Sequence, residues 1–282
     1  MRWSAVRRGS AIWGLVGTIA PLLVVAFVRE PQRYLEEDTE PINFVRTTRE
    51  VFSNRPFRIG AVIYLLAFGA VDIITAVFVW FLIYYMQLSP PQDSMVLALV
   101  LGVAFLSMPL NVWLMKKFGK GKTYAGMMTF WALVMVVISI LPPGNLPLVL
   151  ALGALAGLGY GAANAVPWAI LADVIEEDEW KTGKRREGVY AGFLVTLRKL
   201  STAIGIGIVV RLLASAGFVE GAAATQPDSA VFMLRIFMGA VPAVLLLISM
   251  VAAFNYPIRV KATPSWCKNW LKGEPRRKHS AE

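Results

Sequence analysis

Three ionisable residues interrupt apolar stretches of this sequence, and charged groups in such surroundings are the ones best suited to do chemistry. Asp72 lies in the apolar stretch 59–86, and Arg198 and Lys199 lie together in the stretch 189–212. At about 1.5 Å per helical residue, Asp72 would lie roughly 20 Å and Lys199 roughly 16 Å along its helix, near the middle of a bilayer. Charges at that depth are costly and usually mark the path of an ion or a substrate. We therefore expect Asp72 and Lys199 to face one polar cavity.

Arg198 and Lys199 are neighbours, so their side chains leave a helix about 100° apart and only one of them can point straight at a given axis. We favour Lys199, because the residues on its face are small or carry hydroxyl groups and leave room for water or a ligand. These residues are Gly192, Thr196, Thr202 and Ala203. The alternative is that Asp72 and Lys199 are buried charges that only tie helices together.

Two further residues are candidates for the lining of the cavity, and both lie in the stretch 147–171. Trp168 follows Pro167 near one end of this stretch, where a tryptophan either anchors the helix at the membrane interface or lines the cavity. Asn164 lies one turn earlier, where it either bonds a neighbouring helix or contacts a ligand. The same stretch carries Gly153, Gly157 and Gly161 at four-residue spacing, which predicts a face that another helix can approach closely.

Composition identifies the elements that must position these residues as membrane helices. Hydrophobic residues make up 57% of the 282 residues, charged residues make up 16%, and the mean hydropathy is +0.59. Such values are typical of a polytopic membrane protein. The net charge of +10 would suggest nucleic acid as a partner for a soluble protein. Here the cations gather in the connections between apolar stretches, which indicates membrane topology and no nucleic-acid partner.

Seven stretches are apolar and long enough to cross about 30 Å of hydrocarbon as helices. They are 10–28, 59–86, 95–115, 123–141, 147–171, 189–212 and 230–255. The odd number puts the two termini on opposite sides. Lys and Arg are concentrated in alternate connections and in the tail, so the positive-inside rule places the C-terminus in the cytoplasm and the N-terminus outside. Three arginines near the N-terminus conflict with this topology: Arg2, Arg7 and Arg8.

Two cytoplasmic connections have features of their own. The connection 29–58 is the longest, and its segment 42–52 spaces apolar residues along one side, which predicts a surface helix. The stretch 171–199 contains a hinge between two spans, in which an acidic run at 173–179 gives way to a basic run at 184–186. The sign of the charge therefore reverses within one short loop.

Three segments resemble one transporter family. The run PWAILADVIEEDEWKTGKRREGVYAGFLVTLRKL, 167–200, is similar to the loop between helices ten and eleven of the glycoside–pentoside–hexuronide cation symporters. These are the melibiose-permease-like branch of the major facilitator superfamily. NRPFRIGAVIYLLAF, 54–68, resembles that family's entry into helix seven, and LMKKFGKGKTY, 114–124, resembles its basic loop between helices eight and nine. The three segments occur in the order that the family has.

The resemblance implies an all-α fold that is the C-terminal half of such a carrier. Residues 1–28 would be the equivalent of helix six, 29–58 the central cytoplasmic loop, 59–256 the six-helix bundle and 257–282 a basic cytoplasmic tail. The family's N-terminal half, which holds its main cation-binding carboxylates, would be a missing partner. Lys199 matches a helix-eleven lysine near the family's cation and sugar sites, and three residues match its cytoplasmic gate: Asp173, Arg186 and Glu187.

The expected function is therefore symport of a sugar or glycoside coupled to Na⁺ or H⁺ by alternating access, in a bacterial-type plasma membrane, with no cofactor. The segment PWAILADV is also similar to lysophospholipid carriers of the same branch, so a lysolipid is the alternative substrate. A truncated or accessory membrane protein without independent transport is a second class. An enzyme lacks support, because no nucleophile–base or metal constellation is visible; Cys267 is the single cysteine and His279 the single histidine.

Overall fold

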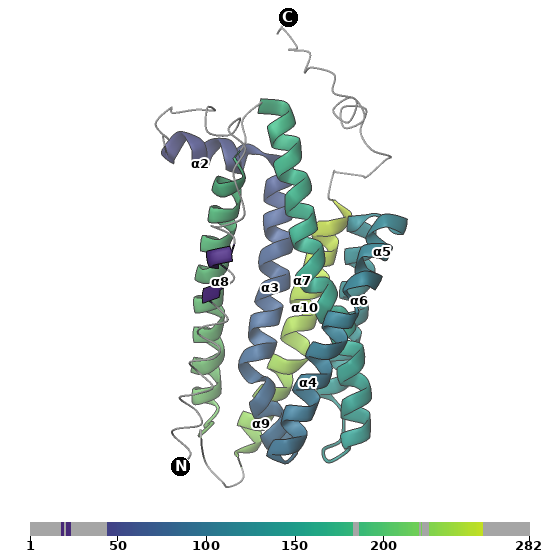
Figure 1. Ribbon diagram of the computed structural model, residues 1–282. Coiled ribbons are helices and arrows are strands. Elements are labelled where there is room, and N and C mark those ends of the chain that lie inside the picture. The colour runs from purple at the N-terminus through teal and green to yellow at the C-terminus, as the bar shows by residue number, and fades with distance from the viewer. Residues whose placement is uncertain are drawn as a thin grey trace, which may run out of the picture. The chain divides into compact units, whose positions relative to one another are not determined.

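The computed structural model describes residues 18–19, 21–23, 44–182, 186–219, 221 and 226–255 (Figure 1). The chain divides into two units, residues 1–47 and residues 48–282. In the first unit the described residues are short helical pieces at 18–19 and 21–23 and the start of helix α2. Most of the expected span 10–28 and all of the basic tail 257–282 lie outside the described residues.

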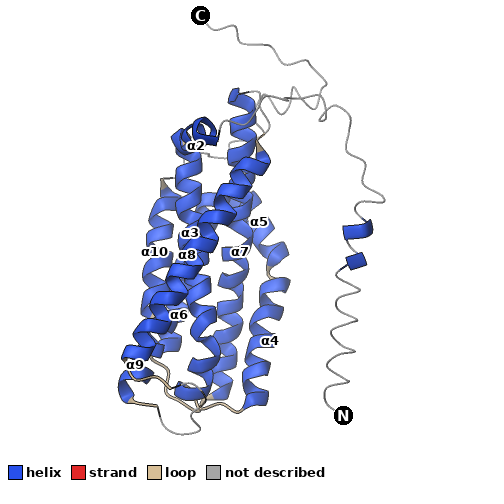
Figure 2. Ribbon diagram, turned by 90° about the vertical axis from the view of Figure 1, so that its left-hand side faces the viewer, coloured by secondary structure: helices blue, strands red, loops and turns tan. Residues whose placement is uncertain are grey.

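The second unit is built of helices only, within the ranges described above (Figure 2). Their bounds are α2 Phe44–Ser53, which begins in the first unit, α3 Arg55–Trp80, the π-helix η2 Phe81–Tyr85, α4 Pro90–Leu106, α5 Met108–Phe118, α6 Lys120–Ser139, α7 Leu146–Thr182, α8 Glu187–Ser215, α9 Asp228–Met238 and α10 Ala240–Phe254. Five of the described helical segments can cross a membrane by length and composition, or six if α4 and α5 form one bent span. These six coincide with the six stretches predicted between residues 59 and 255. An all-α polytopic membrane fold is therefore confirmed.

The connections at one end of the helices carry most of the cations, and we call this end of the second unit the basic end. Here α3 begins, α5 passes into α6, α7 approaches α8, and α10 ends. The connections at the opposite end, 86–89, 140–145 and the described parts of 216–227, contain no Lys or Arg. The alternation of basic and neutral connections predicted from the sequence therefore agrees with the arrangement of the helices.

The start of α3 is fixed by local sequence. Asn54 is the N-cap residue, its side chain accepts a bond from the Phe57 amide, and Pro56 lies in the first turn, where its missing N–H costs nothing. The predicted surface helix is present as α2, which ends at Ser53 directly before this cap. Val51 of α2 is fully buried and Phe52 meets Phe57 edge to face at 5.6 Å, so the apolar side of α2 packs on the start of α3.

The acidic run after residue 171 differs from the prediction. The sequence suggested a loop over 173–188, but α7 continues to Thr182 and carries Asp173, Glu176 and Asp178 on its final turns. The helix continues through these turns because Val174 is buried, Asp173 and Asp178 have cationic partners, and Glu176 is exposed to solvent. The hinge between α7 and α8 is therefore much shorter than expected.

The predicted glycine face of α7 is confirmed. A Cβ atom at Gly157 would lie 2.7 Å from the Val100 carbonyl oxygen, and one at Gly161 would lie 2.8 Å from the Ala104 carbonyl oxygen and overlap the Ser107 hydroxyl. On the other side of α7, a Cβ at Gly159 would overlap the Trp131 side chain of α6. α7 thus lies in close contact with α4 on one face and with α6 on the other, which only glycine permits.

The bend between α4 and α5 lies at the same level as these contacts. The two helices meet at 41° around Ser107, and Pro109 follows in the first turn of α5. The Ser107 hydroxyl donates to the Ala104 carbonyl at 2.7 Å and accepts from the Asn111 amide at 3.3 Å. Pro109 removes the N–H that would have bonded the Phe105 carbonyl, and the Ser107 hydroxyl bonds the carbonyl of Ala104, the residue before Phe105, so the bend has an identifiable cause.

Replacing Gly161 by leucine tests this packing. The added side chain must displace α4 from α7, so we expect Gly161→Leu to lower the free energy of unfolding by about 1–3 kcal/mol, or more. Gly102→Leu is the matched control, since Gly102 lies in α4, is exposed, and has nothing within 4 Å of the position of its Cβ. Unfolding of both variants in detergent would be followed by tryptophan fluorescence. Equal stability of the two variants would contradict the close approach.

Candidate functional site

The mid-depth charges come together in a cluster between α3 and α8. Asp72 of α3 forms an ion pair with Arg198 of α8, with 3.6 Å between Oδ1 and a guanidinium nitrogen. The Thr202 hydroxyl donates a short hydrogen bond to the other carboxylate oxygen, Oδ2. The side chain of Asp72 is 16% exposed and that of Arg198 is 35% exposed. The carboxylate therefore has a partner on each oxygen, and both partners come from α8.

The ion pair differs from the prediction, which favoured Lys199 over Arg198 as the cation that accompanies Asp72. Arg198 and Thr202 are four residues apart, so they share one face of α8, and this face is turned toward α3. Lys199 is rotated about 100° from Arg198 and is exposed. The guanidinium also lies over the Phe68 ring at 3.9 Å, an arrangement that suits arginine better than lysine. The choice between adjacent cations depended on where α8 packs.

A hollow of about 390 Å³ lies on one side of this cluster and contains Lys199. Trp168 of α7 and Tyr64 of α3 form its aromatic part, and their rings meet edge to face at 5.3 Å. Trp168 is 42% exposed. Arg198, Lys199 and Thr202 supply the polar part, so two cations and two aromatic rings face the same space.

A second hollow, of about 420 Å³, lies between α3, α8 and α10 and includes Asp72. Apart from Asp72 and two hydroxyls its lining is apolar, with residues such as Leu66, Leu197 and Ile204. Thr202 lines both hollows. The bond from Thr202 to Asp72 therefore lies between a space lined by cations and aromatic rings and a space lined mainly by aliphatic side chains.

Of the two further candidates for the cavity lining, one lines a hollow and the other does not. Trp168 lines the first hollow, whereas Asn164 lines neither of the two and donates to the Tyr160 carbonyl of its own helix at 2.9 Å. Asp72 and Lys199 line different hollows, with Arg198 and Thr202 between them. Among the described residues there is no group of three or more His, Cys, Asp or Glu placed to hold a metal ion.

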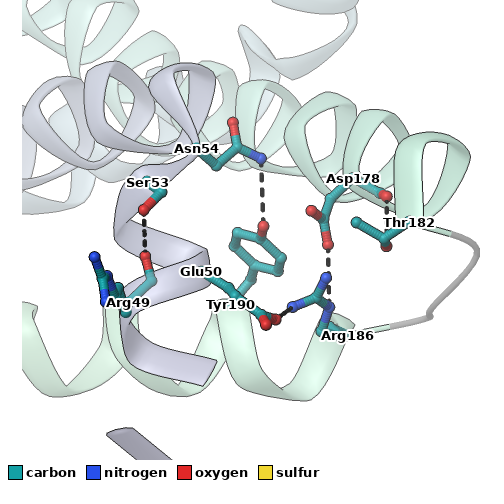
Figure 3. Close-up of polar contacts among 8 residues, drawn as sticks. All are labelled: Arg49, Glu50, Ser53, Asn54, Asp178, Thr182, Arg186 and Tyr190. Carbon is teal, nitrogen blue, oxygen red and sulfur yellow. Dashed lines mark hydrogen bonds and ion pairs between the residues drawn. The ribbon is translucent and has the colours of Figure 1, made fainter. Parts of the chain in front are cut away.

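The predicted gate residue Arg186 lies at the centre of a polar cluster at the basic end (Figure 3). Its guanidinium bonds Glu50 of α2 at 2.7 Å and pairs with Asp178 of α7 at 3.4 Å. The side chains of Arg186 and Asp178 are 14% and 10% exposed, and that of Glu50 is 42% exposed. Arg186 precedes the first residue of α8, so one side chain joins three helices.

A second link at the basic end joins α3 to α8. The Asn54 amide that caps α3 donates to the hydroxyl of Tyr190 at 3.3 Å, and the Tyr190 ring meets Phe57 at 5.0 Å. Phe193 of α8 meets Phe52 of α2 at 5.6 Å. Aromatic contacts therefore hold the start of α8 against α2 and α3.

The other two predicted gate residues lie elsewhere on α7 and α8. Asp173 lies on α7 and pairs with Lys120 of α6 at 2.5 Å, and Lys120 also donates to the Ala169 carbonyl at 2.8 Å. Glu187 is the exposed first residue of α8. Asp173 thus ties α7 to α6, while Arg186 ties α8 to α7 and α2.

Several members of these clusters were not predicted in the roles that they have: Arg198 was set aside in favour of Lys199, and Thr202 was assigned to the face of Lys199. Thr202 and Arg198 had a detectable signal, because they lie four residues apart at the depth of Asp72 and form a polar stripe on an apolar helix. Asp178 was part of the acidic run, but nothing in the run distinguishes it from Glu176. Glu50 and Lys120 gave no signal, since their partners lie 136 and 53 residues away in the sequence.

Long apolar helices, charges within them and open hollows between them are typical of membrane transport proteins of the helical-bundle class. The chain belongs to the MFS/sugar transport protein family, whose model matches residues 8–259. It is therefore an integral membrane protein of a transporter family and not an enzyme.

The chain is similar to several curated transporters. It is 32% identical over 226 residues to an uncharacterized symporter of Synechocystis sp., covering 78% of this chain and 41% of the relative. It is 28% identical over 244 residues to the sodium-dependent lysophosphatidylcholine symporter 1 of Homo sapiens, covering 85% and 44%. It is 29% identical over 250 residues to a putative 2,3-dihydroxypropane-1-sulfonate exporter of Escherichia coli, covering 86% and 52%. The chain thus spans about half the length of the relatives that it matches.

A double-mutant cycle tests the mid-depth ion pair. Asp72→Asn and Arg198→Gln each leave a partner unpaired. We therefore expect the double variant to lose less unfolding free energy than the two single variants lose together, by about 0.5–3 kcal/mol. Free energies of unfolding in mixed detergent micelles would give this coupling. The control cycle pairs Asp72→Asn with Lys199→Gln and should be additive. Coupling in the control cycle with none in the first would restore Lys199 as the partner.

A second set of variants tests the cluster around Arg186. Arg186→Gln leaves the nearly buried Asp178 carboxylate without its cation, so we expect a loss of about 1–3 kcal/mol in unfolding free energy. Glu50→Gln removes a more exposed partner and should cost about 0–1 kcal/mol. Glu176→Gln is the control, because Glu176 is exposed on the same part of α7. If Arg186→Gln is no more destabilising than Glu176→Gln, Arg186 does not hold these helices together.

Proposed function

We propose that this chain supplies one helical bundle of a cation-coupled secondary transporter that works by alternating access. The observation that carries the proposal is the Asp72–Arg198–Thr202 cluster at mid-depth, between two hollows that open at the surface of the bundle. Family membership and a symporter among the relatives support the same reading. In such carriers the site stays near the midplane while one bundle rocks against another.

The exposed face of α8 supports the presence of a second bundle. In its most apolar window only 11% of α8 is buried within the described structure, although this helix carries Arg198 and Lys199. A helix with two mid-depth cations is stable in a membrane when its polar side faces protein or water. We propose that this side faces the other half of the carrier across the central cavity.

Asp72 is the proposed coupling residue. Its carboxylate accepts from Thr202 and pairs with Arg198, so a Na⁺ ion or a proton on Asp72 would compete directly with the guanidinium. Neutralising Asp72 in this way would release Arg198 toward the cavity. A ligand shifts an equilibrium only by its different affinity for the two states, and the competition for Asp72 supplies such a difference.

The substrate class that the geometry supports best is an organic molecule with an anionic group. Arg198 and Lys199 face the first hollow, whereas the carboxylate of Asp72 faces the second, so the first hollow has a surplus of positive charge. The adjoining aliphatic hollow would suit a hydrocarbon chain. Two relatives are named for transport of a lysophosphatidylcholine and of a sulfonate, and both molecules carry such an anionic group.

A sugar or glycoside is the second candidate. The half-exposed ring of Trp168 beside Tyr64 in the first hollow offers a face on which a sugar ring can stack. The family's description as MFS/sugar transport favours the same class. In this case Arg198 and Lys199 would donate hydrogen bonds to hydroxyl groups.

The basic end is proposed to be the cytoplasmic side, with the C-terminus on that side of a plasma membrane, because cations favour cytoplasmic connections. The cluster of Arg186 with Glu50 and Asp178, and the pair of Lys120 with Asp173, would then be the cytoplasmic gate. Ion pairs between helices can form in one state and break in the other, and pairs that exist in one state only shift the equilibrium toward it. Glu187, at the start of α8, stays a predicted member of the gate.

Ligand binding by the purified chain in nanodiscs tests the proposal. The panel consists of a lysophosphatidylcholine, 2,3-dihydroxypropane-1-sulfonate and a methyl glycoside, each titrated with and without sodium and at two pH values. We expect Lys199→Gln to weaken binding of the two anionic-group ligands by about tenfold to a hundredfold, since it removes a charge-assisted bond. The control is Arg211→Gln, an exposed cation on the same helix that lines neither hollow.

Three outcomes would test the substrate class, the coupling residue and the site itself. Glycoside binding that is lost in Trp168→Ala and unchanged in Lys199→Gln would favour the sugar. An effect of sodium or pH on affinity that disappears in Asp72→Asn would support its coupling role. Binding of none of the three ligands, or equal effects of Lys199→Gln and Arg211→Gln, would contradict the proposed site.

A further inference from the structure

A group of lysines and aromatic rings lies at the junction of α5 and α6, away from the central site. Its members, which we call the α5–α6 patch, are Trp113, Lys116, Lys117, Phe118 and Lys122. Gly119 ends α5 with a φ of +84°, a conformation open to glycine, so the chain reverses there and α6 begins at once at Lys120. The last turn of α5 and the first turn of α6 are therefore neighbours at the basic end.

The patch holds a cation over exposed aromatic rings. The ammonium of Lys117 lies 4.8 Å from the centre of the Trp113 ring and 5.4 Å from that of Phe118. These rings are 51% and 50% exposed, and they meet edge to face at 6.4 Å. Half-exposed tryptophan beside lysine at the end of a spanning helix is typical of the level of the lipid headgroups.

The lysines of the patch have no carboxylate partner in the described part of the chain. Lys116, Lys117 and Lys122 are all exposed. Lys116 and Lys117 suit the C-terminal end of α5 electrostatically. Lys122 lies in the first turn of α6, where the helix dipole disfavours a cation and no side chain caps the helix. Its neighbour Lys120 is neutralised by Asp173, but Lys122 is not.

The patch continues into an apolar surface along the same bent pair of helices. Leu110 and Val112 of α5 are 42% and 44% exposed, and Phe105 and Leu106 of α4 are 77% and 74% exposed. An anion that binds at the lysines would thus have hydrocarbon-binding surface directly beside it. A free inorganic anion would use only the lysines, whereas a phospholipid would use both parts.

We propose that the α5–α6 patch binds the headgroup of an anionic phospholipid of the leaflet at the basic end, with the acyl chains along α4 and α5. The phosphodiester lies between Lys116, Lys117 and Lys122, and Trp113 and Phe118 contact the glycerol and the first methylene groups. Each lysine near an anionic headgroup strengthens association by about fivefold. This inference does not depend on the proposed substrate or on the coupling residue.

Native mass spectrometry of the whole chain, released from nanodiscs, tests the proposal. Phosphatidylglycerol and phosphatidylcholine with identical acyl chains are the probes, and the fraction of protein with bound lipid gives the affinity. We expect phosphatidylglycerol to be preferred by the unaltered chain, and Lys116→Gln/Lys122→Gln to lower its affinity by about thirtyfold. The matched control is Arg55→Gln/Arg58→Gln, which removes two exposed cations at the same end of the bundle.

Four results would overturn the proposal. Equal binding of the two lipids by the unaltered chain does so without any variant. Equal losses in the two double variants would mean that general surface charge attracts the lipid. Full competition by glycerol phosphate would indicate a site for free anions, and unchanged affinity in Trp113→Ala/Phe118→Ala would remove the aromatic rings from it. By contrast, the Lys116→Arg/Lys122→Arg variant keeps both charges, so we expect it to bind phosphatidylglycerol as well as the unaltered chain does.

Discussion

The position of α8 depends on its polar contact with α3 in the middle of the bundle. α8 is the least buried of the five described helices that can each span a membrane alone, and it packs mainly on α3. Apolar contacts between helices are weakly selective in a membrane, because lipid chains are as apolar as leucine. The carboxylate of Asp72, held by Thr202 and Arg198, therefore specifies how α8 is rotated and how high it lies. That rotation in turn decides that Lys199 faces the first hollow.

The rest of the bundle relies on a different kind of contact. α7 is placed by backbone approach, since glycine on two of its faces lets α4 and α6 come closer than any side chain would allow. α8 is placed by a few polar groups and by aromatic contacts at its start. Interiors packed at close range resist rearrangement, whereas ion pairs and hydroxyl bonds exchange partners readily. The structure thus combines a firm group of helices with one helix whose contacts can change.

The sequence predicted the helices well and the site only partly. Apolar stretches and glycine spacing are local properties, so the spans and the packing face of α7 could be located from them. The positions of Asp72 and Lys199 along their helices could also be predicted, by counting residues from the ends of the apolar stretches. The partner of Asp72 could not, because the choice between Arg198 and Lys199 is a rotation of about 100° that only packing decides. The contacts of Glu50 and Lys120 join distant segments, and the length of α7 required knowing that Val174 is buried.

One consequence follows from the coincidence of the bend at Ser107 with the contact to Gly161. The Ser107 hydroxyl bonds Ala104 and Asn111 and lies where a Cβ of Gly161 would be, so the packing is tight at the point where α4 turns into α5. Dense packing passes a displacement on to its neighbours. α5 would therefore pivot at Ser107, and a tilt of α7 would move the far end of α5 through the headgroup layer. Conversely, a change in the thickness or tension of the surrounding bilayer would move α5, and the contact at Ser107 would pass that movement to α7.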